Sequence, residues 1–287
     1  VESIHQVIEK ALNEAKVTLK QIDLIAVTKG PGLIASLLVG LNTAKALAYA
    51  LNKPLIGVNH LEGHLLAVFL QETIEFPFIA LTVSGGHTEL YRVDGFGMYK
   101  KLGRTRDDAA GESFDKVAKM LKLGYPGGPV IEKMARLGNP SAHRFPRSFL
   151  EKGSLDFSFS GLKTSVRNVI AKRERGKGPD LSDADISAGF QEAVVDVLTA
   201  KLIMACEQEG LDRVVVTGGV AANGALRERV VSEGGENGIK AWFPKPVFCT
   251  DNAAMIACAG YHKCLDKLPV SGSALDLDAS ATLKLGL

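Results

Sequence analysis

The chain has 287 residues, of which 46% are hydrophobic and 23% are charged, and its formal net charge is +2. A chain of this length buries a large core and exceeds the size at which one core usually divides, so we expect two lobes. The small net charge does not demand a nucleic acid partner, and we see no apolar run as long as a membrane span. The four cysteines show no CxxC spacing and follow no signal peptide, which predicts reduced thiols in a cytoplasmic protein.

Basic residues gather in two stretches of the chain. The first contains Lys100, Lys101, Arg104 and Arg106, and the second contains Lys163, Arg167, Lys172, Arg173, Arg175 and Lys177. Such runs are usually solvated faces, so by themselves they are weak evidence for a polyanionic partner.

The chain opens within an amphipathic helix, because apolar residues recur at helical spacing over residues 4–15. A strand is expected at residues 22–28, followed by the turn Gly30-Pro31-Gly32 and a second helix. That helix carries a stripe of small residues at Ser36, Gly40, Ala44 and Ala48. The stripe permits close packing, either against a partner protein or within its own lobe.

A strand at residues 54–58 leads directly into His60-Leu61-Glu62-Gly63-His64. Histidines four positions apart lie on one face of a helix, so both imidazoles can reach one ion, and the distant Asp251 would supply a third ligand. Such a set suits Zn²⁺ or Fe²⁺ and leaves positions open for water or substrate. The structural alternative is that His60 caps the helix and His64 packs. A zinc protease is disfavoured, because Glu62 falls roughly on the helix face opposite His60.

A glycine turn at Gly85-Gly86 interrupts the apolar stretch 76–93. This pattern predicts a β-hairpin whose turn exposes backbone N–H groups, and such groups can cradle a phosphate. An ordinary hairpin explains the turn equally well.

A second glycine loop, Gly218-Gly219, follows an apolar strand and precedes a helix. That arrangement points the N–H groups of the helix N-terminus toward an anion or a ribose. Asn223 is expected in the first turn of this helix, where its amide can both donate and accept. Two such loops in one chain favour a nucleotide ligand more than either does alone.

The region between the two loops is predicted to be mainly helical, from about residue 107 to about residue 210. It contains Tyr125-Pro-Gly-Gly128 and the stretch 156–163, whose serines and Lys163 could line a cleft or cap a helix that starts near Gly161. Residues 173–183 are charged and contain glycine and proline, which predicts a mobile loop.

These blocks resemble the bacterial TsaD branch of the tRNA threonylcarbamoyladenosine transferases, once labelled O-sialoglycoprotein endopeptidases. The likeness spans essentially the whole chain. The blocks that carry it are residues 30–32, 59–64, 83–88, 107–116, 125–128, 156–163, 218–223 and 249–252.

The resemblance implies an α/β protein with an actin-like ATPase (ASKHA) fold, built from two RNase H-like lobes with a helical insertion and with the active site between the lobes. Residues 1–75 would be the remainder of the first lobe, with the metal helix. Residues 76–287 would be the second lobe, with the insertion at about 107–210 and Asp251. Family members begin with a strand carrying a Glu-Thr-Ser-Cys-Asp-like loop that this sequence lacks, so we expect a first lobe truncated at its N-terminus.

The resemblance also implies a reaction, the transfer of a threonylcarbamoyl group from threonylcarbamoyl-adenylate to N6 of the adenosine next to the anticodon, in tRNAs that read codons beginning with A. By motif position, His60, His64 and Asp251 would hold one divalent metal, Fe²⁺ or Zn²⁺. The adenylate or ATP would be held by Thr82, Val83, Ser84, Gly85, Gly86, Asp115, Gly128, Glu132 and Asn223. From the residues alone, Asp115 would instead form a surface ion pair with Lys119.

No Ser-His-Asp set and no cysteine beside a base is evident, so we expect catalysis by positioning and electrostatics rather than through a covalent intermediate. Family members act with partner proteins that make the adenylate, which predicts heteromeric assembly. Three alternatives stay open, namely a non-catalytic scaffold partner of the same fold, a metalloprotease and a small-molecule kinase. The metal residues argue against the scaffold.

Overall fold

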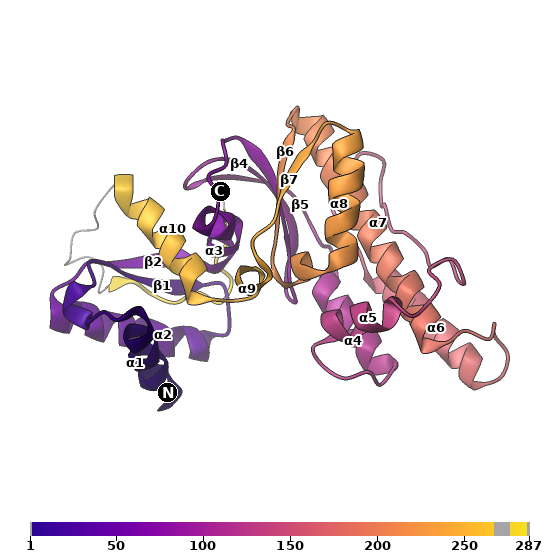
Figure 1. Ribbon diagram of the computed structural model, residues 1–287, viewed down its shortest axis with the longest axis horizontal. Helices are drawn as coiled ribbons and strands as arrows, with labels where there is room; N and C mark the ends of the chain where they lie inside the picture. Colours follow the sequence, from indigo (N-terminus) through magenta and orange to yellow (C-terminus); the bar gives the residue numbers. More distant parts are fainter. Residues whose placement is uncertain (1, 267–275, 286–287) are drawn as a thin grey trace. The chain divides into compact units, whose positions relative to one another are not determined.

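The computed structural model describes residues 2–266 and 276–285 (Figure 1). The chain forms two compact units, the first comprising Val1–Glu72 and Asn252–Leu287, the second Thr73–Asp251. The first break lies near the expected boundary. Residues 252–287, which we expected in the second lobe, belong instead to the first unit, because helix α10 (Ala253–Asp266) packs on helix α3 and strands β1 and β2 of that unit.

The first unit is built on a two-stranded parallel sheet of β1 (Ile25–Gly30) and β2 (Leu55–Asn59). Its helical segments are α1 (Glu2–Ala15), η1 (Leu19–Gln21), α2 (Ile34–Leu51), α3 (His60–Leu66), η2 (Ala67–Leu70) and α10. The opening helix, both strands and the two following helices therefore lie where the sequence predicted them.

Helix α2 covers β1 with part of the predicted small-residue stripe. Ala44 and Ala48 are buried together with Leu37 and Leu41, whereas Ser36 is exposed. Packing within the first unit thus accounts for the second half of the stripe. By length and composition α2 is also apolar enough to cross a membrane, a property that core helices of soluble proteins share. This corrects our expectation that no apolar run approaches that length.

Residues 276–285 run beside the sheet of the first unit. The Ser280 N–H donates to the Lys29 carbonyl (2.8 Å), and the Gly32 N–H donates to the Ala281 carbonyl (3.2 Å). Gly30 has φ +149°, and a Cβ built there would lie 2.1 Å from the Ser280 carbonyl oxygen. The turn at residues 30–32 therefore needs glycine because another backbone segment lies against it.

The second unit contains a five-stranded sheet in the order β5-β4-β3-β6-β7. Strands β3 (Phe78–Val83), β4 (Thr88–Gly95) and β5 (Met98–Arg104) are antiparallel, while β6 (Arg213–Thr217) and β7 (Lys240–Trp242) extend the sheet parallel to β3. The predicted hairpin is β3–β4. Strand β5 was not predicted, and it carries much of the first basic stretch.

Helices pack on this sheet to form the core of the second unit. They are α4 (Ala110–Met120), α5 (Gly127–Ala135), α6 (Ser160–Glu174), α7 (Asp183–Glu209), η3 (Gly219–Ala222), α8 (Gly224–Glu236) and α9 (Pro246–Cys249). Helix α7 is buried on most sides and begins at the N-cap Ser182, whose hydroxyl accepts from the Asp185 N–H (3.0 Å). Phe190 of α7 contacts Phe114 of α4 edge to face, which ties the helical region to the sheet core.

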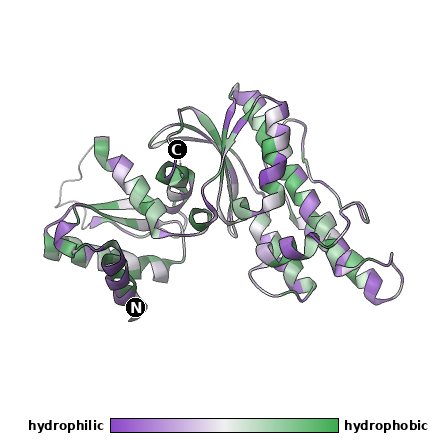
Figure 2. Ribbon diagram, viewed as in Figure 1, coloured by the Kyte–Doolittle hydropathy of each residue, from purple (hydrophilic) through white to green (hydrophobic). Residues whose placement is uncertain are grey.

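Ion pairs within the second unit neutralise part of the two basic stretches, mainly the first. Lys100 pairs with Glu209 (3.0 Å) and Lys101 pairs with Glu89 (2.7 Å). Arg106, Lys163 and Arg173 also pair with carboxylates. Figure 2 shows hydrophilic residues at the C-terminal end of α6, whose last turn contains Lys172 and Arg173.

Candidate functional site

The two glycine loops meet at one edge of the sheet of the second unit. Strands β3 and β6 are parallel neighbours, with Thr82 opposite Thr217, so their carboxyl ends lie side by side. Gly218 has φ +92°, and a Cβ built there would lie 2.4 Å from the Val83 carbonyl oxygen. Glycine at this position lets the second loop lie directly against the end of β3, where α/β sheets place their ligands.

The first glycine loop is a tight turn with an open outer side. The Ser84 N–H donates to the His87 carbonyl (2.7 Å), and the His87 N–H donates to the Ser84 hydroxyl (3.1 Å). Gly85 and Gly86 are exposed, and a Cβ built at either would meet nothing within 4 Å. The turn is therefore held by its ends, and its glycine backbone stays accessible to a ligand.

Helix α4 begins against this turn. The Ala110 N–H donates to the Thr88 hydroxyl (2.9 Å), and the Gly111 N–H donates to the Ser84 carbonyl (3.2 Å). A Cβ built at Gly111 would lie 2.5 Å from that carbonyl oxygen, so the glycine allows the close approach. The helix consequently carries Asp115, one turn later, to the neighbourhood of the loop.

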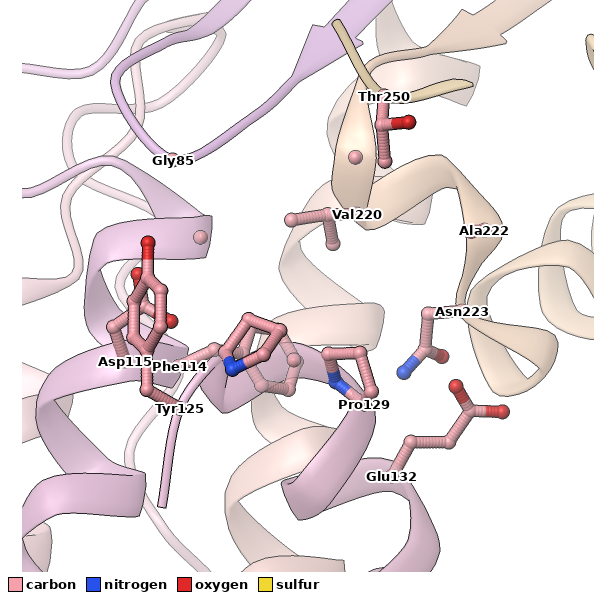
Figure 3. Close-up of a pocket in the computed structure, with 14 residues that line it drawn as sticks. Gly85, Phe114, Asp115, Tyr125, Pro129, Glu132, Val220, Ala222, Asn223 and Thr250 are labelled. Atoms are coloured by element: carbon pink, nitrogen blue, oxygen red, sulfur yellow. The ribbon is translucent and has the colours of Figure 1, made fainter. Parts of the chain in front are cut away.

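A cavity of about 250 Å³ opens between the loops and helices α4 and α5 (Figure 3). It is lined by Gly85, Gly111, Phe114, Asp115, Tyr125, Pro126, Gly128, Pro129, Glu132, Gly219, Val220, Ala222, Asn223 and Thr250. Glycine backbone and apolar side chains form most of the wall, with two carboxylates and one amide among them. Such a lining suits a flat, partly apolar ligand that carries hydroxyl groups.

Asp115 anchors the second wall of the cavity. One of its carboxylate oxygens accepts a hydrogen bond from the N–H of Gly127, the first residue of α5 (2.7 Å). A Cβ built at Gly127 would lie 2.4 Å from the Asp115 Cα. The carboxylate thus stabilises the N-terminus of α5, the favourable end for a negative charge. This long-range contact takes the place of the local ion pair with Lys119 that helical spacing suggested.

Glu132 and Asn223 face each other across the far end of the cavity (Figure 3). Glu132 accepts from the Gly224 N–H (3.1 Å) and from Arg136 (2.7 Å). Asn223 is the N-cap of α8, where its side-chain oxygen accepts from the Leu226 N–H (3.0 Å) and its amide donates to Gln191 (2.8 Å). Both side chains are oriented by these contacts before any ligand binds.

Of the nine residues assigned to the adenylate, Gly85, Asp115, Gly128, Glu132 and Asn223 line the cavity. Thr82 and Val83 are fully buried in β3 and lie behind the loop, so their side chains do not reach the cavity. Ser84 and Gly86 belong to the turn but are not part of the lining.

Sequence reasoning missed several residues of the wall. They are Gly111, Phe114, Tyr125, Pro126, Pro129, Gly219, Val220, Ala222 and Thr250 as individual lining positions. Most lie inside the sequence blocks that resemble the transferase family, so those blocks were the signal that could have identified them. Which members of a block face the cavity depends on the packing of α4 and α5 and could not be inferred from spacing.

Two aspartates join the segment before α4 to the start of α6. Asp107 accepts from the hydroxyls of Ser158 and Ser160 and from the Phe159 and Ser160 N–H groups. Asp108 pairs with Lys116 and Lys163. Burial alone would raise the pKa of both carboxyl groups, but these hydrogen bonds hold each pKa below its ordinary value. The stretch 156–163 thus braces the N-terminus of α4 and caps α6.

Arg227 connects the second glycine loop to the segment that ends in Asp251. Its guanidinium donates to the carbonyls of Ala221 (2.6 Å) and Pro244 (2.7 Å) and to the Cys249 sulfur (3.3 Å). Burial raises the pKa of the Cys249 thiol, and burial raises that of Cys206 to about 12. Neither thiol is suited to act as a nucleophile at neutral pH.

The two histidines lie on helix α3 in the first unit. Asn59 is the N-cap of this helix and accepts from the Leu61 N–H (2.9 Å), so the cap is not His60. The His60 and His64 rings have centroids 4.8 Å apart, and His64 is buried while His60 is partly exposed. Both imidazoles therefore occupy one side of α3, as the spacing predicted.

Glu62 points into a different environment from the two histidines. It is 1% exposed, and its carboxylate pairs with Lys263 of α10 at 2.6 Å. A buried carboxylate committed to an ion pair is poorly suited to act as the general base of a protease.

Asp251 is the exposed last residue of the second unit, and its peptide bond joins it to Asn252 of the first unit. The Asn252 side chain accepts from the Met255 N–H (2.8 Å) at the start of α10. A Cβ built at Gly63 of α3 would lie 2.8 Å from the Ile256 side chain, so the first turn of α10 packs on the histidine helix.

The fold that carries this sheet order and these glycine loops is also found in solved structures of other proteins. The chain resembles the HypF structure from T. kodakarensis with a TM-score of 0.68 at 15% identity, over 95% of this chain and 44% of that one. It resembles the activator of 2-hydroxyisocaproyl-CoA dehydratase from Clostridium difficile, solved with bound ADPNP, with a TM-score of 0.53 at 16% identity, over 93% and 82%. The chain has the expected actin-like ATPase fold.

Sequence relatives narrow this class to one family. Residues 1–258 match the family TsaD, tRNA N6-adenosine threonylcarbamoyltransferase. The relative so named from Thermodesulfovibrio yellowstonii is 58% identical over 92% of this chain and 80% of its own length. The relative of the same name from Clostridium kluyveri is 51% identical over 100% and 83%. The chain belongs to the tRNA N6-adenosine threonylcarbamoyltransferase family.

Proposed function

We propose that this protein transfers a threonylcarbamoyl group from threonylcarbamoyl-adenylate to N6 of the adenosine next to the anticodon, in tRNAs that read codons beginning with A. The observation that carries the proposal is the cavity of the second unit, in a chain that belongs to this transferase family. Two glycine loops at one sheet edge offer backbone to a phosphate, while Asp115, Glu132 and Asn223 offer hydrogen-bonding groups to a ribose.

Catalysis in this proposal rests on placement and electrostatics. Thiols with raised pKa values and the absence of a Ser-His-Asp motif in the sequence give no support to a covalent enzyme intermediate. Holding the adenylate carbonyl next to the attacking amine converts a bimolecular step into one between positioned groups. The prearranged side chains of Glu132 and Asn223 support this role, because they need not reorganise when the ligand binds.

We further propose that His60, His64 and Asp251 hold one divalent metal, Fe²⁺ or Zn²⁺. Two imidazoles and one carboxylate are a ligand set that suits such an ion. The packing of α10 on α3 supports the assignment, because Asp251 is tied by the chain to residues that contact the histidine helix. A bound ion would neutralise charge on a phosphate and polarise a carbonyl. The buried Glu62–Lys263 pair argues against a protease at the same residues.

The proposal also covers where the protein acts and which molecules it acts with. The protein would act in the cytoplasm with tRNA, and partner proteins of the threonylcarbamoyladenosine pathway would supply the adenylate. A scaffold without catalysis is a weaker hypothesis, because it gives no reason for two histidines and an aspartate suited to a metal.

The test is nucleoside mass spectrometry of unmodified tRNA incubated with the protein, its adenylate-making partners, threonine, bicarbonate and ATP. We expect threonylcarbamoyladenosine with the wild type and a loss of at least about 100-fold with Asp251→Ala, because even groups that only support metal ligands are worth about 10- to 100-fold. Asp212→Ala, an exposed change at the residue before β6, is the matched control and should keep full activity. No product from folded, metal-loaded wild type would contradict the proposal.

A further inference from the structure

A second concavity lies beside the adenylate cavity, on the surface formed by α4 and the loop that leads to α5. It has a volume of about 510 Å³ and is lined by Glu112, Asp115, Lys116, Lys119, Lys122, Gly124 and Tyr125. Asp115 and Tyr125 line both this groove and the cavity. A ligand in the groove therefore lies next to whatever occupies the cavity. We call this concavity the lysine groove.

The charge of the lysine groove differs from that of the two basic stretches. Lys116 is committed to Asp108 (2.8 Å) and Glu112 (2.7 Å), so it contributes little free positive charge. Lys119 and Lys122 are exposed, and neither forms an ion pair with any residue of the chain that the structure describes. These two ammonium groups are available to an anionic ligand, whereas Lys100, Lys101, Arg106, Lys163 and Arg173 of the two basic stretches already have carboxylate partners.

Tyr125 presents an aromatic ring at the boundary between groove and cavity. The residue is 83% exposed, so the face of its ring is accessible to a ligand. Figure 3 shows it on the α4 side of the cavity, with Asp115. An exposed ring flanked by lysines is the combination that binds single-stranded nucleic acid, because bases stack on the ring and phosphates pair with the cations.

We propose that the lysine groove binds the anticodon loop of the tRNA substrate. Tyr125 stacks on an unpaired base of the loop, and Lys119 and Lys122 bind phosphates on either side of it. An amine in a stacked loop cannot reach an activated carbonyl, so an acceptor base must be drawn out of its stack at the cavity mouth. The proposal rests on the proposed transferase function and adds the place where its tRNA substrate binds.

The first test measures the dissociation constant of unmodified tRNA for the full chain as a function of salt concentration. The variant carries Lys119→Gln with Lys122→Gln. Because each single-strand phosphate contact adds roughly 0.7 to the slope of log affinity against log salt, we expect the slope to fall by about 1.4. The matched control carries Arg175→Gln with Lys177→Gln, two exposed cations between α6 and α7. An unchanged slope in the first variant, or an equal fall in the control, overturns the proposal.

The second test examines the stacking role of Tyr125. Tyr125→Ala should weaken tRNA binding by about 5- to 150-fold, the range found for loss of one stacked base, while Tyr125→Phe should stay near wild type. Tyr125 also lines the cavity, so AMP affinity is measured by calorimetry in the same variants, and Tyr125→Ala should weaken AMP binding less than tRNA binding. If Tyr125→Ala instead weakens AMP and leaves tRNA unaffected, the ring covers the nucleotide and the proposal is wrong.

Both tests measure binding without transfer, so they separate this inference from the proposed function. Salt-dependent binding through the groove in a protein that transfers nothing supports the groove and refutes the transferase. If the protein transfers the group but its tRNA affinity is unchanged when Lys119, Lys122 and Tyr125 are replaced, the transferase function is supported and the groove is refuted.

Discussion

The candidate site of the second unit is built mainly from backbone, whereas the candidate site of the first unit is built from side chains. In the second unit, glycine backbone from the ends of β3 and β6 forms the cavity, and hydrogen bonds within that unit hold it. In the first unit, two imidazoles on α3 form the site, and an ion pair between the buried Glu62 and Lys263 joins that helix to α10. A backbone site is sensitive to any added side chain, whereas a side-chain site is sensitive to the loss of one.

Breaking the ion pair behind the histidines should have the largest effect on stability. Lys263→Met removes the half-buried ammonium group that lies 2.6 Å from the Glu62 carboxylate, which is 1% exposed. We expect the free energy of unfolding to fall by about 3 kcal/mol, the lower end of the cost for buried pairs that lose one member, because only the carboxylate of this pair is fully buried. Chemical denaturation followed by circular dichroism measures it. The double change Glu62→Leu with Lys263→Met should recover most of the loss, and a single-variant cost below about 1 kcal/mol would show that the pair is not buried in solution.

Two adjacent glycines of α5 test the backbone site. A Cβ at Gly127 would lie 2.4 Å from the Asp115 Cα, while a Cβ at Gly128 would meet nothing within 4 Å. Gly127→Ala should therefore cost about 2 kcal/mol through overpacking. Gly128→Ala should be neutral or stabilising but weaken AMP, because its methyl group enters the cavity. Equal stability of the two variants would mean that α4 and α5 are not in the contact described.

Asp115 should have two separable roles. Asp115→Ala removes the acceptor for the Gly127 N–H, a cap-like contact worth about 1 kcal/mol of stability. Asp115→Asn keeps an acceptor oxygen but removes the charge, so stability should change little. Nucleotide affinity should fall about 10-fold in Asp115→Asn, as expected for a hydrogen bond to a charged group. Thermal unfolding and AMP calorimetry on both variants separate the roles, and an unchanged affinity would exclude Asp115 from the ligand site.

Lowering the pH should destabilise the second unit, because it protonates Asp107 and Asp108. This is the smallest of the four effects predicted here. The pKa of each carboxyl group lies below its ordinary value of 3.8 in the folded protein. Their stabilisation is therefore complete above that value and is lost as pH falls through the folded pKa. Asp107→Asn should flatten the fall of Tm below about pH 4. A variant whose acid profile matches the wild type would contradict the role given to Asp107.

Local patterns predicted much of the fold and the motifs of both sites. Histidine spacing predicted that His60 and His64 share a face of α3, and glycine after strand patterns predicted both loops. Strand β5 was missed because it is a largely exposed edge strand with Lys100 and Lys101 in succession, which breaks the alternation of a half-buried strand.

Contacts between distant segments could not be predicted from spacing. Helical periodicity paired Asp115 with Lys119, yet its carboxylate accepts from Gly127, twelve residues away. The placement of residues 252–287 in the first unit likewise depends on packing between α10 and α3. Tyr125 lay inside a recognised block, but its exposure follows only from the path of the loop between α4 and α5.

Amide hydrogen exchange with and without AMP tests most directly whether the second unit holds the nucleotide part of the adenylate. AMP bound between the glycine loops should slow exchange at residues 84–87, 127–132 and 218–223, which belong to the loops and walls of the cavity. Exchange at residues 5–12 of α1 should not change. Slowed exchange only outside the three cavity segments, from a protein that binds AMP, would contradict the nucleotide site described here.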